Sequence, residues 1–245
     1  MTYNFKALTD AWTVIYDDLG HNEKHELSDF LSKTVDGSKL HATTGISIRI
    51  LEPQNCIMYS AVRKAKPSVI AKHIKLMVDF INSHYTDLFK DSFTNKYSGF
   101  TLLYNNVEIY LTLINGKLNA ISNLGMIDGW SAFPYVATKY IIAQMFIAKT
   151  LDVDLGWHQF NCFDFHINES NFVTNHEQYN KAINDFYLIG KEGIPYFKYF
   201  DSRDYRITLD ELISDSDILL DDKIEEKTLK NECMRYLLNL NSEVD

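Results

Sequence analysis

Four side chains that could bind a metal or transfer a proton recur near the middle of the chain: His158, Cys162, Asp164 and His166. Alternate residues of a β-strand point to the same face, so these four would share one face of a strand over this segment. Same-face neighbours are roughly 7 Å apart along a strand, so a tetrahedral zinc site would need further ligands from other segments. The spacing does not favour a metal centre, and we predict none.

Cys162 is also a candidate nucleophile, because a thiolate is a strong nucleophile. No Lys or Arg adjoins it in the sequence, and an isolated cysteine is usually a buried apolar residue. We therefore expect Cys162 to be buried and unreactive. Asp128 precedes Gly129, a pair common in turns, so its carboxylate has two interpretations, a ligand-binding group or a turn residue.

The segment that positions these residues is predicted to contain a hairpin, a long helix and a further strand. Asn115-Gly116 is a strong hairpin signal, and it joins strands expected at 108–113 and 118–122. Apolar residues at helical spacing predict a buried helix over Tyr135–Leu151, followed by a strand at Phe160–Ile167. Elsewhere we expect short helices within 3–31, a strand at 45–51, helices at 67–85, 177–189 and 224–240, and an irregular stretch at 86–98.

The composition predicts one folded domain over residues 1–245, since 46% of the residues are hydrophobic and 23% are charged. A net charge of −9 argues against general nucleic-acid binding, which needs clustered Lys and Arg. The three cysteines form no disulfide framework, and the N-terminus shows no secretory signal, which indicates a cytoplasmic setting. Lys139, Gln144 and Lys149 interrupt the most apolar window, so we expect no membrane span.

A set of spaced residues in this central unit resembles the thymidylate synthase family, which includes the deoxycytidylate hydroxymethylases. The similarity covers about 43–175, and the C-terminal third diverges. It implies an α+β fold with a mixed β-sheet and a long buried central helix, a homodimer packed through sheet faces, and a pyrimidine nucleotide as ligand. The residues that carry it are Asn115-Gly116-Lys117-Leu118, Asp128, Phe133-Pro134-Tyr135, Tyr140, Ala148, Asp152, Gly156, Asp164 and His166.

Several positions to which the family assigns chemistry hold other residues here. The family's nucleophilic cysteine falls on Asn105, and an amide cannot add to a pyrimidine ring. The Arg-Ser pair that holds phosphate falls on Gly125-Met126, and the base-reading Asn falls on Val136. The family's catalytic Glu would fall near Leu76, with Asp79 one turn away.

Asp128 and His166 remain as candidate substrate-binding residues by the same similarity; Asn168 falls where the family has a sugar-binding Tyr, and its amide could still hydrogen-bond a sugar. His166 also has a structural interpretation, as a histidine held by backbone or by Asp164. A phosphate grip could come from Arg63, Lys64 and Lys66 or from Arg203 and Arg206, although such basic runs are usually solvated loops.

Two functions remain open on these residues. The first is a non-catalytic binding or assembly protein in a pyrimidine-nucleotide context, without methyl- or hydroxymethyltransferase activity and without a cofactor. The second is a nucleotide-modifying enzyme of the superfamily that uses a non-cysteine mechanism, for which a folate would be the expected cofactor. Loss of the nucleophile, the phosphate arginine and the base-reading amide together favours the first.

Overall fold

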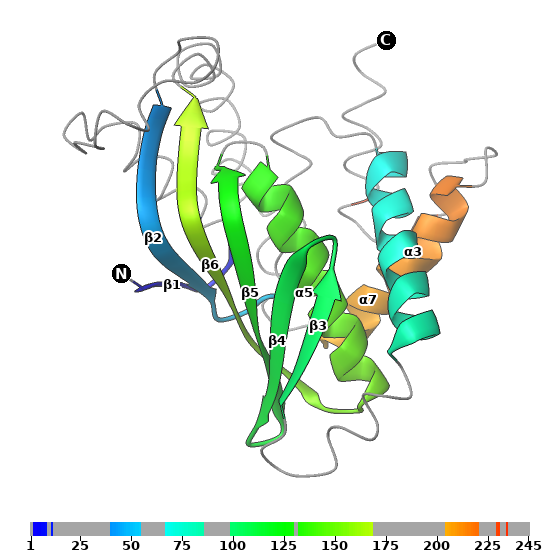
Figure 1. Cartoon of the computed structure of the whole chain (residues 1–245). Helices are drawn as coiled ribbons and strands as arrows, with labels where there is room; N and C mark the ends of the chain where they lie inside the picture. The colour runs from blue at the N-terminus through cyan, green and yellow to red at the C-terminus, as the bar shows by residue number, and fades with distance from the viewer. Residues whose placement is uncertain are drawn as a thin grey trace, which may run out of the picture.

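The computed structural model describes residues 2–8, 11, 40–54, 67–85, 99–129, 132–168, 204–220, 229–230 and 234. These residues form the α+β architecture that the sequence predicts, with a mixed sheet and a long buried helix (Figure 1). The elements in order are β1 (Thr2–Phe5), β2 (Leu40–Ile50), α3 (Pro67–His84), β3 (Gly99–Tyr104), β4 (Val107–Ile114), β5 (Lys117–Asp128), α5 (Ala132–Thr150), β6 (Asp154–Asn168) and α7 (Tyr205–Leu220).

The described strands form a six-stranded sheet in the order β1-β2-β6-β5-β4-β3. Strands β3, β4 and β5 are antiparallel neighbours, whereas β5 and β6 run parallel. Strand β2 is antiparallel to β6 and parallel to β1. Parallel neighbours need a crossover connection, which α5 supplies between β5 and β6. The carboxyl ends of β5 and β6 therefore lie at one edge of the sheet, with Asp128 paired to His166.

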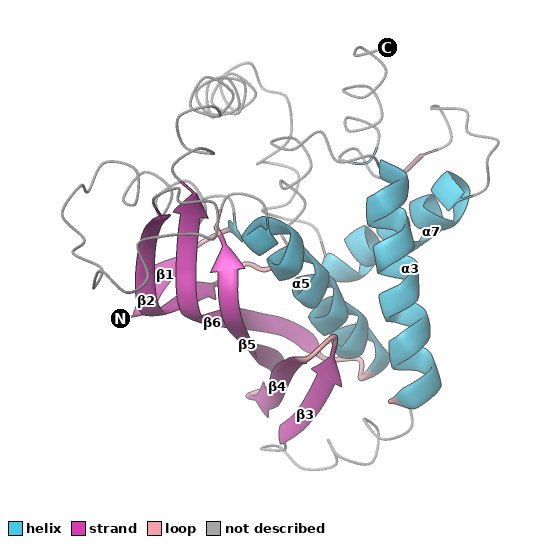
Figure 2. Ribbon diagram, turned by 45° about the horizontal axis from the view of Figure 1, so that its top comes forward, coloured by secondary structure: helices cyan, strands magenta, loops and turns pink. Residues whose placement is uncertain are grey.

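The helices α3, α5 and α7 lie on one face of the sheet (Figures 1 and 2). Helix α5 is apolar around most of its circumference because the sheet covers one side and α3 and α7 pack on the other. It ends in a Schellman motif, in which Val153 N donates to Ala148 O at 3.0 Å while Asp152 takes a positive φ of 52°. None of the described helices is long and apolar enough to cross a bilayer.

A register shift interrupts the pairing of β5 and β6 next to Leu118. Such a shift leaves backbone groups without ladder partners, and buried side chains satisfy them here. Gln144 Nε2 of α5 donates to Leu118 O at 2.7 Å and to Trp157 O at 3.2 Å. Trp157 N donates to Asn119 Oδ1 at 3.1 Å. Only glycine fits at Gly156, because a Cβ there would collide with the Asn119 side chain.

The structure confirms the hairpin, the long helix and the strand that the sequence places in the central unit. It corrects two boundaries. Strand β5 continues to Asp128 where we expected a loop after Ser122, and β6 begins at Asp154 and not at Phe160. Strands β5 and β6 pair with each other, and this pairing stabilises both extensions, although Asn123 and Gly125 interrupt the apolar alternation of β5.

Other sequence predictions had mixed outcomes. Strand 45–51 and helix 67–85 are confirmed as β2 and α3. The sequence missed β3, α7 and the strand at residues 2–5, to which β2 offers a parallel edge. The helices expected at 177–189 and 224–240 and the irregular stretch 86–98 lie outside the described residues, apart from 229–230 and 234.

Candidate functional site

The position that the similarity assigns to the nucleophile lies in a tight turn. Asn105 and Asn106 join β3 to β4, both side chains are exposed, and their φ angles are 50° and 61°. Two successive positive φ angles are what a type I′ hairpin turn requires, and Asn tolerates them better than other residues with a Cβ. The local backbone therefore gives Asn105 a conformational role, and its amide offers no nucleophile.

The other positions at which this chain differs from the family give a ligand few charged or amide side chains to bind. Gly125 and Met126 are exposed on β5, the Met126 side chain by 65%, and a Cβ at Gly125 would meet nothing within 4 Å. Val136 is half-buried against the core near the start of α5. On α3, Leu76 is 50% exposed and Asp79 is exposed.

The retained residues gather where the parallel strands end. Asp128, the last residue of β5, pairs in register with His166 of β6, and Gly129 N donates to His166 O at 2.7 Å. Gly129 also packs against the Phe165 ring, which a Cβ at that position would overlap. Asn168 closes β6, where its backbone pairs with Leu40, and its side chain lies outside the described residues. The structure thus brings Asp128 and His166 together.

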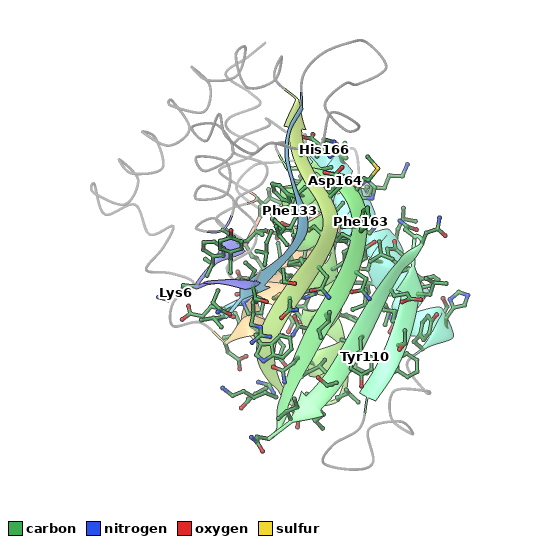
Figure 3. All side chains as sticks on the ribbon, turned by 60° about the vertical axis from the view of Figure 1, so that its left-hand side comes forward. Lys6, Tyr110, Phe133, Phe163, Asp164 and His166 are labelled. Carbon is green, nitrogen blue, oxygen red and sulfur yellow. The ribbon has the colours of Figure 1, made fainter. Side chains whose placement is uncertain are left out.

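Asp164 and His166 lie two residues apart near the end of β6 (Figure 3). The Asp164 carboxylate is 3% exposed and its Oδ1 lies 3.5 Å from His166 Nδ1, whereas the His166 side chain is 20% exposed. Neither of these two atoms has a hydrogen-bond partner within the described part of the chain. A histidine backed in this way by a carboxylate can orient its second nitrogen toward a ligand, to hydrogen-bond a hydroxyl or to move a proton.

His158 has the connectivity of a hydrolase triad but a different role. Its Nε2 lies 2.9 Å from Ser122 Oγ and its Nδ1 lies 2.9 Å from Gln144 Oε1. Gln144 Nε2 donates to backbone carbonyls, so its Oε1 accepts from His158 Nδ1–H, and Nε2 accepts from the Ser122 hydroxyl. All three side chains are at most 1% exposed, which keeps substrate away from the serine.

The zinc hypothesis finds no support in this geometry. His158, Cys162 and Asp164 do share the buried face, as their spacing predicts, while Phe163 between them is 72% exposed. Both His158 nitrogens are engaged, and the described residues hold no group of three metal-binding side chains. Burial raises the pKa of the Cys162 thiol to about 12, which confirms it as an unreactive core residue.

Sequence reasoning missed two polar groups on the buried helix and could have found them. Gln144 and Lys139 were visible as interruptions of an apolar window, and such interruptions mark either polar core contacts or a site. Of the basic clusters proposed for phosphate, Arg63, Lys64, Lys66 and Arg203 lie outside the described residues. Arg206 contacts Asp204, Asp152 and the Val153 carbonyl, and these contacts hold the start of α7 against the segment that follows α5.

Replacement of Asn105 should separate the turn's conformational demand from any chemistry. We expect Asn105→Gly to change the free energy of unfolding by less than about 0.5 kcal/mol and Asn105→Val to lower it by about 1–2 kcal/mol, because a β-branched residue is strained at positive φ. Urea unfolding measures both. Thr101→Val, exposed in the extended strand β3, is the matched control and should have little effect. Equal losses in the Gly and Val variants would contradict the turn assignment.

The buried histidine predicts acid sensitivity. Burial lowers the pKa of His158 from 6.5 to about 3 in the folded chain. The unfolded chain therefore binds a proton first as the pH falls, so stability is full above pH 6.5 and declines toward pH 3, by about 1.4 kcal/mol per pH unit from this group.

His158→Gln, which retains an amide donor and acceptor but does not titrate, tests that dependence. The variant should be less stable than the unmodified chain at pH 7, and the difference in free energy of unfolding should shrink as the pH approaches 4. Urea titrations at several pH values measure it, and a difference that does not vary with pH would be inconsistent with a neutral, buried His158.

Comparisons with known proteins give a likeness of fold. No protein-family model matches the chain, and no curated protein matches it in sequence. Among solved structures, thymidylate synthase from T4 phage has a TM-score of 0.46 and 11% identity, over 68% of this chain and 79% of that one. Thermostable thymidylate synthase A from Bacillus subtilis has a TM-score of 0.42 and 14% identity, over 70% and 83% respectively. At these identities the likeness concerns the arrangement of strands and helices, and no activity follows from it.

Proposed function

We propose that this chain binds a pyrimidine nucleotide at the shared carboxyl ends of β5 and β6 and does not transfer methyl or hydroxymethyl groups. His166, 3.5 Å from the buried Asp164, would bind the sugar, with Asp128 on the neighbouring strand and Asn168 two residues further on. Asp128, Asp164 and His166 are positions that the sequence shares with the thymidylate synthase family, whereas Asn168 stands where the family has a sugar-binding Tyr.

The observation that carries the non-catalytic part is the turn at Asn105. Covalent addition to a pyrimidine ring needs a nucleophile aimed at the base, and this position is an exposed amide in a turn with two positive φ angles. Cys162 cannot replace it, since the thiol is 2% exposed on the core face and its pKa is about 12. The alternative, an active enzyme of the superfamily for which a folate would be the cofactor, would need a mechanism that does not use a cysteine adduct at Asn105 or Cys162.

The part of this site that would bind the phosphate is weaker than the part that would bind the sugar. Gly125 and Met126 supply no charge, and loss of a bidentate arginine removes charged hydrogen bonds that contribute about 1.5–3 kcal/mol each. We therefore expect weak binding, in the millimolar range, and a site that needs no cofactor. A Cβ at Gly125 would meet nothing within 4 Å, so a side chain, such as the family's arginine, can begin at this position.

Thermal-shift titrations with deoxyuridine and deoxycytidine monophosphates test this proposal. Stabilisation should appear at millimolar ligand, weaken in His166→Ala and strengthen about tenfold in apparent affinity in Gly125→Arg, because the new guanidinium adds a charged donor. Gly125→Ala is the control, since it adds only a methyl group to the same open space. Absence of stabilisation by both nucleotides would contradict binding, and folate-dependent tritium release from C5 would contradict the non-catalytic assignment.

The same proposal includes a homodimer formed through the sheet face that carries no described helix. Large apolar side chains are exposed on that face: Leu103 by 54%, Tyr110 by 43% and Phe163 by 72% (Figure 3). Exposed apolar side chains grouped on one face are typical of an interface. A second copy of this chain is the occupant that the family similarity implies, since its members pack sheet against sheet.

Polar groups on this face already bind one another. Ser47 Oγ donates to Asn161 Oδ1 at 2.9 Å, and Asn161 Nδ2 donates to Asn123 Oδ1 at 2.9 Å. Arg49 donates to Gln159 Oε1 at 2.6 Å and stacks over Trp157 at 4.4 Å. Because these hydrogen bonds run within the sheet, the amide and hydroxyl groups that they join keep their partners when a second copy covers them, whereas the Arg49 guanidinium would also need an acceptor from that copy.

Phe163→Glu tests the interface. The side chain is exposed, so the variant should fold, but two glutamates buried in a symmetric interface should dissociate the dimer. Size-exclusion chromatography with light scattering measures the mass. Ile207 of α7 is 50% exposed, so Ile207→Glu is the control, and this variant should remain dimeric. A monomeric unmodified chain at micromolar concentration would rule out this interface.

A further inference from the structure

Two basic side chains, His73 and Lys139, lie where α3 and α5 meet, and a third, Lys72, is exposed next to His73. Lys72 and His73 come from α3 and Lys139 comes from α5, and the two helices pack side by side (Figures 1 and 2). Burial first, then the charges of Lys139 and Lys72, lower the pKa of His73, which places the imidazole within electrostatic reach of both lysines. Clusters of like charge oppose folding unless a counter-charge is present.

Lys139 is held in a fixed position within this cluster. Its Nζ lies 4.5 Å from the ring centroid of Tyr104 and 5.3 Å from that of Tyr140, and the side chain is half-buried. The Tyr140 hydroxyl donates to Tyr104 O at 3.2 Å, which fixes the two rings. On the same helix face, the Tyr135 ring meets the His73 imidazole edge-on at 5.0 Å. Aromatic faces favour the protonated amine, so Lys139 presents a charge here.

No carboxylate of the described residues balances this cluster. Lys149 of the same helix contacts Asp210, and Lys75 of α3 binds Asp217 at 2.9 Å. By contrast, Lys139 forms no ion pair with any described residue, and burial, with no acidic contribution, lowers its pKa. The chain as a whole carries a charge of −9, so this group of basic residues is a local departure from an acidic molecule.

We propose that Lys139, His73 and Lys72 form an anion-binding site between α3 and α5 that takes the phosphate group of a small molecule. A phosphate placed there would receive hydrogen bonds from the Lys139 ammonium and the His73 imidazole, and its charge would favour the protonated imidazole, which the two lysines disfavour. The rings of Tyr104 and Tyr140 lie next to the Lys139 amine and favour its charged form. This site does not depend on the nucleotide proposal.

Titration with inorganic phosphate, against sodium chloride at equal ionic strength, tests the site by thermal shift and by calorimetry. Phosphate should stabilise the chain beyond chloride, and Lys139→Met should weaken its binding at least about tenfold, since one charged donor is lost. Lys139→Arg should restore binding. Lys149→Met removes a lysine of the same helix that already has Asp210 as partner, and it should bind phosphate as the unmodified chain does.

The outcomes separate this site from the one at the β5 and β6 ends. Phosphate binding lost in Lys139→Met and retained in His166→Ala supports the α3–α5 site, whatever the nucleotide titrations give. Binding retained in Lys139→Met but lost in His166→Ala would place the anion at the strand ends and overturn the proposal. Equal stabilisation by phosphate and chloride, or equal loss in Lys139→Met and Lys149→Met, would overturn it as well.

Discussion

The register shift between β5 and β6 is the constraint on which the central unit depends. Two parallel strands that slip out of register bury backbone groups with no partners, and an unpaired buried amide or carbonyl destabilises a fold by about 1–3 kcal/mol. Here Asn119 and the Gln144 amide of α5 supply the missing partners. The helix is therefore fixed to the sheet by directed hydrogen bonds as well as by apolar packing, which sets the position of its whole length.

That fixed position explains why a serine, a histidine and an amide lie in a row without forming a catalytic site. His158 uses one nitrogen to hold Gln144 and the other to accept from Ser122, and the ring stacks on Phe160 with 4.3 Å between centroids. Burial keeps the imidazole neutral, with a pKa of about 3. A general base must titrate near working pH and reach a substrate, and His158 does neither. Its role is to orient the amide that closes the register shift.

The sequence carried enough information for the elements with strong local signals. Asn115-Gly116 at a hairpin and the apolar spacing of Tyr135–Leu151 are consequences of backbone geometry and burial, which act locally. Strand β3 and the ends of β5 and β6 depend on pairing with partners distant in sequence, so local composition did not reveal them. Helix α7 was missed because acidic residues interrupt the spacing of its apolar residues. Which of its residues are buried depends on packing against α3 and α5.

The site shows the same division between local and distant determinants. The similarity placed Asp128 and His166 in one site, and the parallel pairing of β5 and β6 does bring them together. It could not reveal what Asn105 does, because that depends on the φ angles of a turn and not on the chemistry of a side chain. Nor could it pair Lys139 with His73, since no spacing in the sequence relates two helices separated by three strands.

The backbone conformation of the turn at Asn105 also disfavours a cysteine at that position. A residue at positive φ is strained unless it is Gly, Asn or Asp, so a thiol would destabilise this hairpin and would sit on its exposed tip. Strands β3 and β4 pair from Gly99 with Thr112 to Tyr104 with Val107, which leaves only two residues for the turn. Reinstating the nucleophile would thus require a longer connection between β3 and β4, a change of backbone and not of one side chain.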